Sequence, residues 1–367
     1  MNYMKLDRIV TISSGQNAPQ DQNEYCLDGY TFIKVSNLDD IINDDNESKA
    51  CKITVEAISN NKLKVVPKKS ILFAKSGLSC VKNRVYLTKK ETYVVNHLCI
   101  LSNVIDSYDP EWLLYFIKAF DVTKLIKDES YPSISLKDIK NINVPVISKE
   151  KQQSMIKNLN YINSLIKKKQ KESFFLDELI KSQFIEMFGD VFYNDNRYNQ
   201  VKIRDIVKYE QPTKYIVSSE EYNNSYETPV LTAGKNFILG YTKEKNGIFI
   251  GSKEKVIIFD DFTCDSKIVN FDFKVKSSAI KILHMKKGVN IDFFYNVLKQ
   301  HHYNVANHKR HWISTFEIMK IGLPPLKLQN KYASFVEQID KSKFIVQKEI
   351  KDLQELLDKK MDEYFGQ

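Results

Sequence analysis

Two stretches of the chain carry a spacing of apolar residues that is typical of long helices. Steps of three and four residues lead from Leu159 to Met187 and from Val336 to Tyr364, mostly through apolar positions, with Lys, Glu, Gln and Asp between them. The rows are Leu159, Ile162, Ile166, Lys169, Ser173, Leu176, Ile180, Gln183 and Met187, and Val336, Ile339, Lys343, Val346, Ile350, Leu353, Leu357, Lys360 and Tyr364. Neither stretch contains Pro or an interior Gly, so each predicts a helix of roughly 38 residues and about 55–60 Å. Such narrow rows favour a coiled coil over a helix lying on its own domain.

The sequence before each long helix is also repeated. Four pairs keep their order along the chain: MKLDRIV (4–10) with VKIRDIV (201–207), EWLLYFIK (111–118) with DFFYNVLK (292–299), ISLKDIKNINVP (134–145) with ISTFEIMKIGLP (313–324), and EMFG (186–189) with EYFG (363–366). The offset between partners falls along the chain, which places insertions in the early part of the first copy. We therefore predict two copies of one module, 4–189 and 201–366.

The first part of each copy has the mixed pattern of an α/β or α+β domain. Short apolar runs between Lys, Asn and Gly turns predict buried strands at SILFA (70–74), ETYVVNHLCIL (91–101), GIFIG (247–251) and KVIIFD (255–260). Aromatic and aliphatic residues at helical spacing predict helices at 110–120 and 291–301. The predicted organisation is a domain at 1–145, a long helix at 146–189, a linker at 190–200, a second domain at 201–324 and a second long helix at 325–367.

The short linker constrains how the chain runs. Gly189 ends the first long helix, and only 190–200 separates it from the second domain. The chain must then continue from the far end of the first helix into the second domain and return along the second helix. This path predicts an antiparallel coiled coil with a globular domain at each end and pseudo-two-fold symmetry.

Composition narrows the class of partner. The formal net charge is +9 and the isoelectric point is near 8.9, which favours an anionic partner, nucleic acid above all. The five cysteines are an odd number without a CxxC pair, as expected of reduced thiols in the cytoplasm. The first ten residues have no apolar signal core, and no apolar run is long enough to span a bilayer. We expect a soluble, cytoplasmic protein that does not bind a membrane.

Catalytic motifs are missing from the sequence. It contains no GxxxxGK[ST], GxGxxG, HExxH or GxSxG, and no Asn/Asp-Pro-Pro-aromatic tetrapeptide of an amino-methyltransferase. Asp261, Asp265 and Lys267 resemble a fragment of a metal-dependent nuclease, but they are crowded into one stretch, where a polar turn is the simpler interpretation. The histidines of 301–312 fit no common zinc spacing. We predict no catalytic residues, no metal ligands and no cofactor.

Basic, amide and aromatic residues at predicted strand ends and loops are the candidates for DNA contact. Arg and Asn read base edges, whereas Lys more often holds phosphate. The candidates are Lys75, Ser76, Lys82, Asn83, Arg84, Tyr131 and Ser133 in the first copy, and Lys235, Asn236, Lys253, Lys255, His308, Lys309, Arg310, His311 and Trp312 in the second. The stretches 127–135 and 301–312 occupy equivalent places in the two copies. An ordinary solvated surface is the alternative for each candidate.

The whole chain resembles the DNA-specificity subunit of type I restriction–modification enzymes. The resemblance rests on the helix starts IGLPPLKLQ (321–329) and, more loosely, INVPVISKEKQ (142–152), on the helix ends MFG (187–189) and YFG (364–366), on TPVLTAGKNFILGYT (228–242) with IIFDDFT (257–263), and on MKLDRIVTISSG (4–15). It implies two target-recognition domains that read an asymmetric, bipartite double-stranded DNA site with an unread spacer. It also implies two methyltransferase subunits and restriction/translocase subunits as partners.

The repeated proline has a physical interpretation within this resemblance. We expect each proline to end the last strand of its domain and to start a helix at an N1-like position, so that both helices leave their domains at the same angle. A coiled-coil scaffold whose globular ends bind proteins, and a stand-alone nuclease, remain as alternatives. The first explains the long helices equally well but the basic charge poorly.

Overall fold

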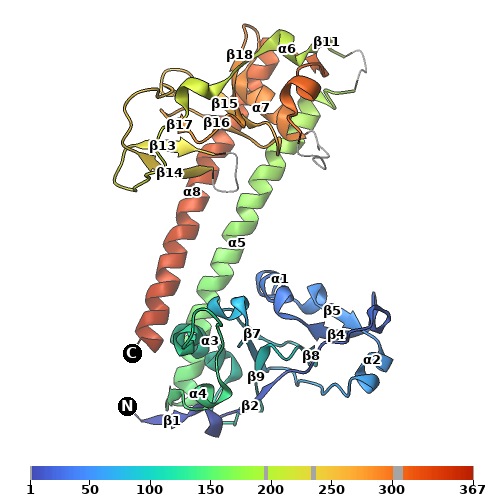
Figure 1. Cartoon of the computed structure of the whole chain (residues 1–367), viewed down its shortest axis with the longest axis vertical. Helices are drawn as coiled ribbons and strands as arrows, with labels where there is room; N and C mark the ends of the chain where they lie inside the picture. Colours follow the sequence, from blue (N-terminus) through green and yellow to red (C-terminus); the bar gives the residue numbers. More distant parts are fainter. Residues whose placement is uncertain (1, 194–196, 233–236, 301–308, 367) are drawn as a thin grey trace. The chain divides into compact units, whose positions relative to one another are not determined.

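The computed structural model describes residues 2–193, 197–232, 237–300 and 309–366, and the chain divides into two compact units. Unit 1 comprises residues 1–168 and 350–367, and unit 2 comprises residues 169–349. The two long helices, α5 (Lys149–Phe188) and α8 (Leu326–Phe365), are each continuous (Figure 1). Their bounds, 177 positions apart, confirm the two helices predicted from the apolar rows. Each unit therefore contains one part of both helices.

Unit 1 contains two four-stranded sheets and a short two-stranded ladder. The main sheet has the order β2 (Thr11–Ser14), β9 (Leu98–Ser102), β6 (Ile71–Ala74), β7 (Val85–Leu87) and is antiparallel throughout. The second sheet has the order β3 (Tyr25–Cys26), β5 (Cys51–Ile53), β4 (Tyr30–Ile33), β8 (Tyr93–Val94), and only β4 and β8 are parallel. The ladder pairs β1 (Tyr3–Lys5) with β10 (Asn143–Pro145), and the short helices are α1 (Leu38–Asp44), α2 (Val55–Asn60), α3 (Pro110–Phe120) and α4 (Leu136–Lys140).

Unit 2 repeats the main sheet and the two-stranded ladder, while its second sheet has three strands among the described residues. Its main sheet has the order β12 (Val207–Glu210), β18 (Ile280–Met285), β15 (Val256–Asp260), β16 (Ser266–Val269), again antiparallel. Its second sheet has the order β14 (Ile238–Thr242), β13 (Thr228–Leu231), β17 (Lys274–Val275), with β13 and β17 parallel. The ladder pairs β11 (Asn199–Lys202) with β19 (Lys320–Leu323), and the short helices are α6 (Ile203–Ile206) and α7 (Ile291–Gln300).

The two units therefore share one sheet topology, with β2, β9, β6 and β7 matching β12, β18, β15 and β16. Mostly antiparallel sheets with separate helices make the fold α+β. The predicted strands at 70–74 and 255–260 are confirmed by β6 and β15, and the predicted helices by α3 and α7. The strand predicted at 247–251 is wrong, because only Phe249 forms an isolated bridge, to Phe273.

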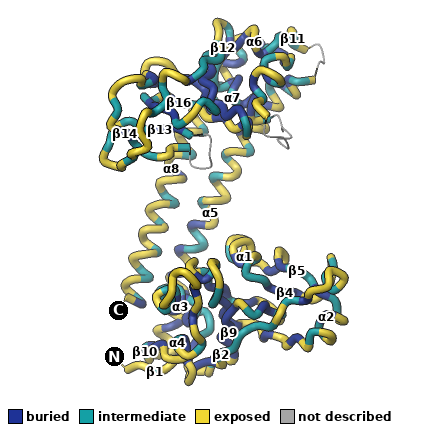
Figure 2. Tube along the Cα trace, viewed as in Figure 1, coloured by how far each residue is buried: buried dark blue, intermediate teal, exposed yellow. Residues whose placement is uncertain are grey.

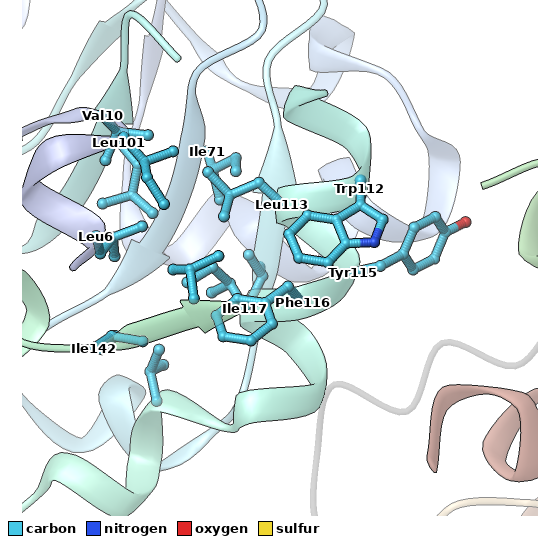
Figure 3. Packing of buried hydrophobic residues seen from close by; sticks show 14 of the residues in the cluster. Leu6, Val10, Ile71, Leu101, Trp112, Leu113, Tyr115, Phe116, Ile117 and Ile142 are labelled. Atoms are coloured by element: carbon cyan, nitrogen blue, oxygen red, sulfur yellow. The ribbon is translucent and has the colours of Figure 1, made fainter. Parts of the chain in front are cut away.

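The principal core of unit 1 lies between its main sheet and α3 (Figure 3). Asp109 caps α3 by accepting the Glu111 N–H, and Pro110 occupies the first turn, where its missing N–H is not needed. Apolar side chains of α3 then face the strands: Trp112, Leu113, Phe116 and Ile117 pack with Leu6, Ile71 and Leu101. Phe365 at the end of α8 joins this core, with its ring centroid 5.6 Å from that of Trp112.

Unit 2 has an equivalent aromatic core. Phe293 of α7 packs against Phe184 and Phe188 of α5, while Tyr332 of α8 lies within 5.4 Å of both of these rings. Trp312 and Phe259 complete this core from the sheet side. Each unit thus contains one of the chain's two tryptophans, fully buried.

The long helices contact each other inside each unit. In unit 2, Lys169 pairs with Glu349 at 2.8 Å, Asp177 pairs with Lys343 at 2.5 Å, and the Tyr332 hydroxyl donates to the Ile180 carbonyl. The partner's residue number falls as that on α5 rises, so the helix segments of unit 2 run antiparallel. All positions of the two predicted apolar rows are buried or half-buried, whereas most of their neighbours are exposed (Figure 2).

Two buried glutamines fix the start of each long helix. The Gln152 carbonyl oxygen accepts the Asp109 N–H at 2.7 Å, and its amide donates to the carbonyls of Ser107 and Ile147. Gln329 makes the same three hydrogen bonds: its carbonyl oxygen accepts the Asn290 N–H, and its amide donates to the carbonyls of Gly288 and Pro324. Both glutamines are fully buried. Each ties the first turn of a long helix to the loop that begins α3 or α7.

The expected role of the prolines is only partly correct. Pro145 ends β10, but α5 begins four residues later, and Ser148 accepts the first helical hydrogen bond, from Gln152. Pro325 directly precedes α8 and accepts the N–H groups of Leu328 and Gln329. A serine and a proline therefore serve as equivalent caps. At the other end of α5, Gly189 has a φ of +70° and closes the helix with an N–H to the Ile185 carbonyl.

Gly15 allows the close crossing of β2 over the second sheet. A Cβ atom at this position would lie 2.2 Å from the carbonyl oxygens of Val94 and Val95. The backbone of Gln16 then pairs with Val94 and Asn96. The glycine of the opening motif is thus a packing requirement, and it brings residues 16–17 next to the turn before β9.

Candidate nucleic-acid interface

One end of the main sheet in unit 1 gathers several of the predicted residues. The Lys75 N–H, directly after β6, donates to the His97 carbonyl, and the Lys75 carbonyl accepts the Ile134 N–H at 2.8 Å. Ser76 and Ser133 form a bridge, and the Gly77 N–H donates to the Pro132 carbonyl. The loop after α3 is therefore held by backbone hydrogen bonds at the end of β6. Lys75, Ser76, Tyr131 and Ser133, predicted separately, lie in one place.

The side chains at this strand end form a polar rim. The Ser76 Oγ and His97 Nδ1 atoms are 2.8 Å apart, and the Asn96 amide donates to the Asn17 side-chain oxygen at 2.7 Å. Tyr131 and Leu78 stand on the same loops with 81% and 80% of their surface exposed. Sequence reasoning missed Asn17, Asn96 and His97. Polar residues directly flanking β2 and β9 were the signal for them, but only the pairing of these strands joins them.

Lys82, Asn83 and Arg84 form a second group with partners inside the unit. Arg84 donates to Asp39 at 2.9 Å and its side chain is only 12% exposed, while the Asn83 amide donates to the Lys118 carbonyl at the end of α3. Lys82 is exposed and lies 4.0 Å from Asp39. Arg84 therefore stabilises the turn between β6 and β7, and Lys82 keeps its ammonium near solvent.

The equivalent strand end in unit 2 is anchored by a buried charge pair. Asp261 follows β15, and its carbonyl accepts the His311 N–H at 2.9 Å, while its carboxylate accepts the Trp312 N–H at 2.7 Å. The second carboxylate oxygen lies 3.3 Å from Lys281 Nζ, and both side chains are 2% exposed. Lys281 also donates to Gln211. His311 and Trp312 are thus fixed to the end of β15, which is equivalent to the end of β6 in unit 1.

These contacts correct the prediction for Trp312 and agree with the interpretation of Asp261 as part of a polar turn. Trp312 does not face solvent: it begins the π-helical turn η8 (Trp312–Phe316), is fully buried and stacks on Phe316, so it forms part of the core. The Asp261 carboxylate is occupied by Lys281 and Trp312, so it has a structural role. Within 2–193, 197–232, 237–300 and 309–366, no cluster of three or more His, Cys, Asp or Glu has the geometry of a metal site.

Lys309 and Arg310 stay exposed next to this anchor. The Arg310 guanidinium lies 3.3 Å from Ser278 Oγ and 5.8 Å from the Phe262 ring centroid, held by no carboxylate among the described residues. His311 is half-buried, and its Nε2 atom is buried without a hydrogen-bond partner among the same residues. Arg310 can therefore turn toward a ligand without breaking an ion pair.

The other candidates of unit 2 lie elsewhere. Lys253 is exposed in the turn before β15, and Lys255 pairs with Asp292 of α7 at 2.9 Å. Lys235, Asn236 and His308 lie outside the described residues.

The thiols near both strand ends have raised pKa values. Burial raises the pKa of Cys99 in β9 to about 12. Burial, together with the charges of Asp260, Asp261 and Asp265, raises the pKa of Cys264 to about 11. Both cysteines stay protonated near neutral pH, so neither is poised for nucleophilic chemistry. The groups that these strand ends present to solvent are hydrogen-bonding and cationic.

A membrane span is not found: no helix among the described residues has both the length and the apolar character to cross a bilayer.

Comparison with known proteins supports the resemblance seen in the sequence. Residues 1–173 match the family model described as "Type I restriction modification DNA specificity domain". The chain is 48% identical over 124 residues to the Escherichia coli type I restriction enzyme EcoR124I/EcoR124II specificity subunit, covering 33% of this chain and 31% of that protein. It is 26% identical over 148 residues to the MjaIX specificity subunit of Methanocaldococcus jannaschii, covering 37% and 32%. The matches thus span about a third of these curated relatives.

Solved structures extend the likeness to the whole fold. The crystal structure of the type I restriction–modification S subunit from M. genitalium superposes with a TM-score of 0.58, at 14% identity, covering 98% of this chain and 94% of that one. A structure described as the basis of complex assembly and conformational transition of the type I R-M system superposes with a TM-score of 0.57, at 13% identity, covering 99% and 97%. At such low identity this likeness concerns the fold alone.

Proposed function

We propose that this chain, whose residues 1–173 carry a type I restriction–modification DNA specificity domain, is a sequence-specific DNA-binding subunit without catalysis of its own. It would read an asymmetric bipartite site on double-stranded DNA and direct methyltransferase and restriction subunits to it. The observation that carries the proposal is the repeated strand end. In both units, a residue beyond the equivalent short helix, Ile134 or His311, donates its N–H to the carbonyl of the first residue after the equivalent strand, Lys75 or Asp261.

In this proposal residues 1–145 and 201–324 are the two reading domains, and 190–200 links the halves. The helices at 146–189 and 325–367 form an antiparallel coiled coil with pseudo-two-fold symmetry. The shared sheet order and the antiparallel helix contacts of unit 2 support this arrangement. Two half-sites on a duplex are related by a dyad, and a protein that repeats its reading element about a two-fold axis meets both in the same orientation.

The side chains proposed to read bases lie at the two strand ends. In unit 1 these are Ser76, His97, Tyr131 and Ser133, and in unit 2 Arg310, with Lys309 suited to a phosphate. Hydroxyl, imidazole and guanidinium groups offer the donors and acceptors that distinguish base edges, and exposed Tyr131 offers a ring for apolar contact. The two sets differ chemically, so the two half-sites should differ in sequence.

The long helices are the proposed docking site for two methyltransferase subunits, and restriction/translocase subunits would join through them. Exposed apolar side chains support this partner surface: Phe174 and Phe175 on α5 and Phe344 and Ile345 on α8 are each more than half exposed. Surface aromatics of this kind are enriched at protein interfaces.

The test is a binding selection on random duplexes with the full chain, alone and with its methyltransferase partners. One bipartite sequence should bind about 10³-fold or more tightly than random duplex at physiological salt. Uniform binding of all sequences, governed only by salt, would contradict the proposal. If the isolated chain cleaves DNA with Mg²⁺ and loses this cleavage on Asp261→Ala, the result would favour the alternative function of a stand-alone nuclease.

A further inference from the structure

Each unit contains a cavity between equivalent elements. In unit 1 a cavity of about 490 Å³ lies between β7, the end of α1 and α3. In unit 2 a cavity of about 850 Å³ lies between β16, α7 and the long helices. The lining residues of α3 and α7 correspond at one offset of 181 positions: Glu111 with Asp292, Leu114 with Tyr295, and Lys118 with Lys299. The two cavities are therefore one site that occurs twice.

A lysine occupies the same position in both cavities. Lys118 Nζ lies 5.9 Å from the Tyr115 ring centroid, and Lys299 Nζ lies 5.4 Å from that of Tyr295. Among the described residues, neither ammonium makes an ion pair or a hydrogen bond with another side chain. Burial lowers the pKa of both lysines, the charge of Asp45 or Asp265 raises it in part, and the charge of a second lysine, Lys167 or Lys267, lowers it again. Lys68 and Lys69 line the cavity of unit 1 together with Lys118, and Lys267 lines that of unit 2 together with Lys299. Each cavity therefore holds several ammoniums whose repulsion an anion would relieve.

Most carboxylates around these lysines are already paired. In unit 1, Asp45 is held by Lys89 at 2.6 Å and by Lys167 at 3.6 Å. In unit 2, Lys343 pairs with Asp177 and Lys255 with Asp292. Asp340 also faces the second cavity, and burial raises its pKa. Among the residues that the structure describes, the lining lysines without an ion pair are Lys68, Lys69 and Lys118 in unit 1, and Lys267 and Lys299 in unit 2.

The recurrence itself identifies the ligand. Residues that read different bases must differ between the two units, and the described strand ends do, since Lys75 corresponds to Asp261. The phosphate backbone is the same at every half-site, so a residue that holds phosphate has reason to recur. Lysine is suited to this role as a point charge.

We propose that Lys118 and Lys299 each bind a backbone phosphate of double-stranded DNA, one at each half-site, as the contact that both reading domains share. This inference rests on the proposed function. It adds a sequence-independent phosphate contact, separate from the base-reading strand ends. A partner protein present in two copies could also use a repeated site, and the experiment separates this alternative.

The test compares Lys118→Met, Lys299→Met and the double variant with wild type in the full chain with its methyltransferase partners. Methionine keeps the aliphatic stem over the tyrosine ring and removes only the charge. Each single change should weaken binding to the cognate and to a random duplex by the same factor. It should also reduce the slope of log K against log salt by about 0.9, and the double change by about 1.8. Arginine at either position should restore the slope.

Lys140→Met on α4 and Lys327→Met on α8 are the matched controls, since both lysines are exposed and lie outside the cavities. They should leave slope and affinity unchanged. If the cavity variants bind DNA with the wild-type slope, or lose only the cognate sequence, the inference is overturned and the proposed function stands. Loss of methyltransferase assembly at unchanged DNA affinity would assign the site to the protein partner. If the wild-type complex itself binds DNA without sequence preference, the proposed function is contradicted instead.

A second readout uses the amines directly. Acylation of lysines at limiting reagent, followed by mass spectrometry, should show Lys118 and Lys299 protected by duplex DNA and not by methyltransferase subunits alone. Lys140 should react equally in all samples. Protection by the partner in the absence of DNA would contradict the assignment.

Discussion

The ends of β6 and β15 each accept a backbone hydrogen bond from a residue beyond the equivalent short helix, Ile134 or His311, but the side chains at the two ends differ. In unit 1, Lys75 holds its loop through the backbone alone, and its side chain is half-exposed. In unit 2, Asp261 holds its segment through both its backbone and its carboxylate, which is neutralised by buried Lys281. The position of the loop therefore follows from the sheet topology that the units share. The side chains that secure it are free to diverge, as the proposed function requires of two domains that read different half-sites.

The largest effect should come from removing the charge of the anchor in unit 2. Asp261→Asn leaves Lys281 buried without a counter-charge and should destabilise unit 2 by about 3–5 kcal/mol. The change Lys75→Met in unit 1 should alter stability by no more than about 0.5 kcal/mol, because its side chain takes no part in the anchor. Urea unfolding measured by the fluorescence of one tryptophan reports each unit: Trp312 alone in a Trp112→Phe background, and Trp112 alone in the converse.

The ion-pair explanation has its own control. Lys281→Met combined with Asp261→Asn removes both charges and should recover part of the lost stability, because the buried cation is gone. Equal and small effects of Asp261→Asn and Lys75→Met would mean that both loops are held by their backbones alone.

Substitution of the buried glutamines should lower the stability of the two units by similar amounts, in contrast to the anchor residues. Gln152→Met and Gln329→Met each leave a backbone N–H, of Asp109 or Asn290, without its acceptor in the interior. Each should destabilise its own unit by about 1–3 kcal/mol, measured with the same single-tryptophan chains. A cost confined to one unit would show that the two helix starts are not equivalent.

The glutamines also show how far the sequence could lead. The helix start was recognisable by its proline, its glutamine and the apolar rows, because helix periodicity and caps are local properties. The repeat was recognisable because its anchors are core residues, such as those of α3 and α7, whose spacing the fold preserves. The hydrogen-bonding role of the two glutamines was not recognisable from the sequence, because their partners at 107–109 and 288–290 are about 40 residues away in the chain.

The candidate site was predicted less well for the same reason. Ser76 and Ser133, or His97 and Asn17, become neighbours only through strand pairing, which a single sequence does not specify. Arg84 and Trp312 were attractive as contact residues by type, yet Asp39 holds one and the core encloses the other. Composition suggests which residues could contact DNA, and burial decides which of them are free to do so.

Substitution of a proposed base-reading residue should affect the half-site read by its own unit, with a smaller loss of free energy than the Asp261 change. Arg310→Ala should weaken binding to the cognate site by about 1–3 kcal/mol and relax the bases of one half-site only. Ser76→Ala, which removes one hydroxyl, should cost about 0.5–1.5 kcal/mol and relax the other half-site. Binding selections with one half-site randomised at a time measure this. Relaxation of both half-sites by either change would contradict a division of labour between the units.

The smallest change in recognition should follow from lengthening the helices, because no base contact is altered. The change inserts four residues after Lys169 in α5 and four before Glu349 in α8, the residue that pairs with Lys169. Each insertion adds about one turn, roughly 6 Å, to its helix and nearly preserves the rotation of the helix about its axis. At about 3.4 Å per base pair, the unread spacer should grow by one or two pairs while both half-sites keep their bases. Methylome sequencing of cells carrying the altered subunit would measure the spacer. A change of four residues in both helices that keeps methylation but leaves the spacer unchanged would mean that α5 and α8 do not set the distance between the reading domains.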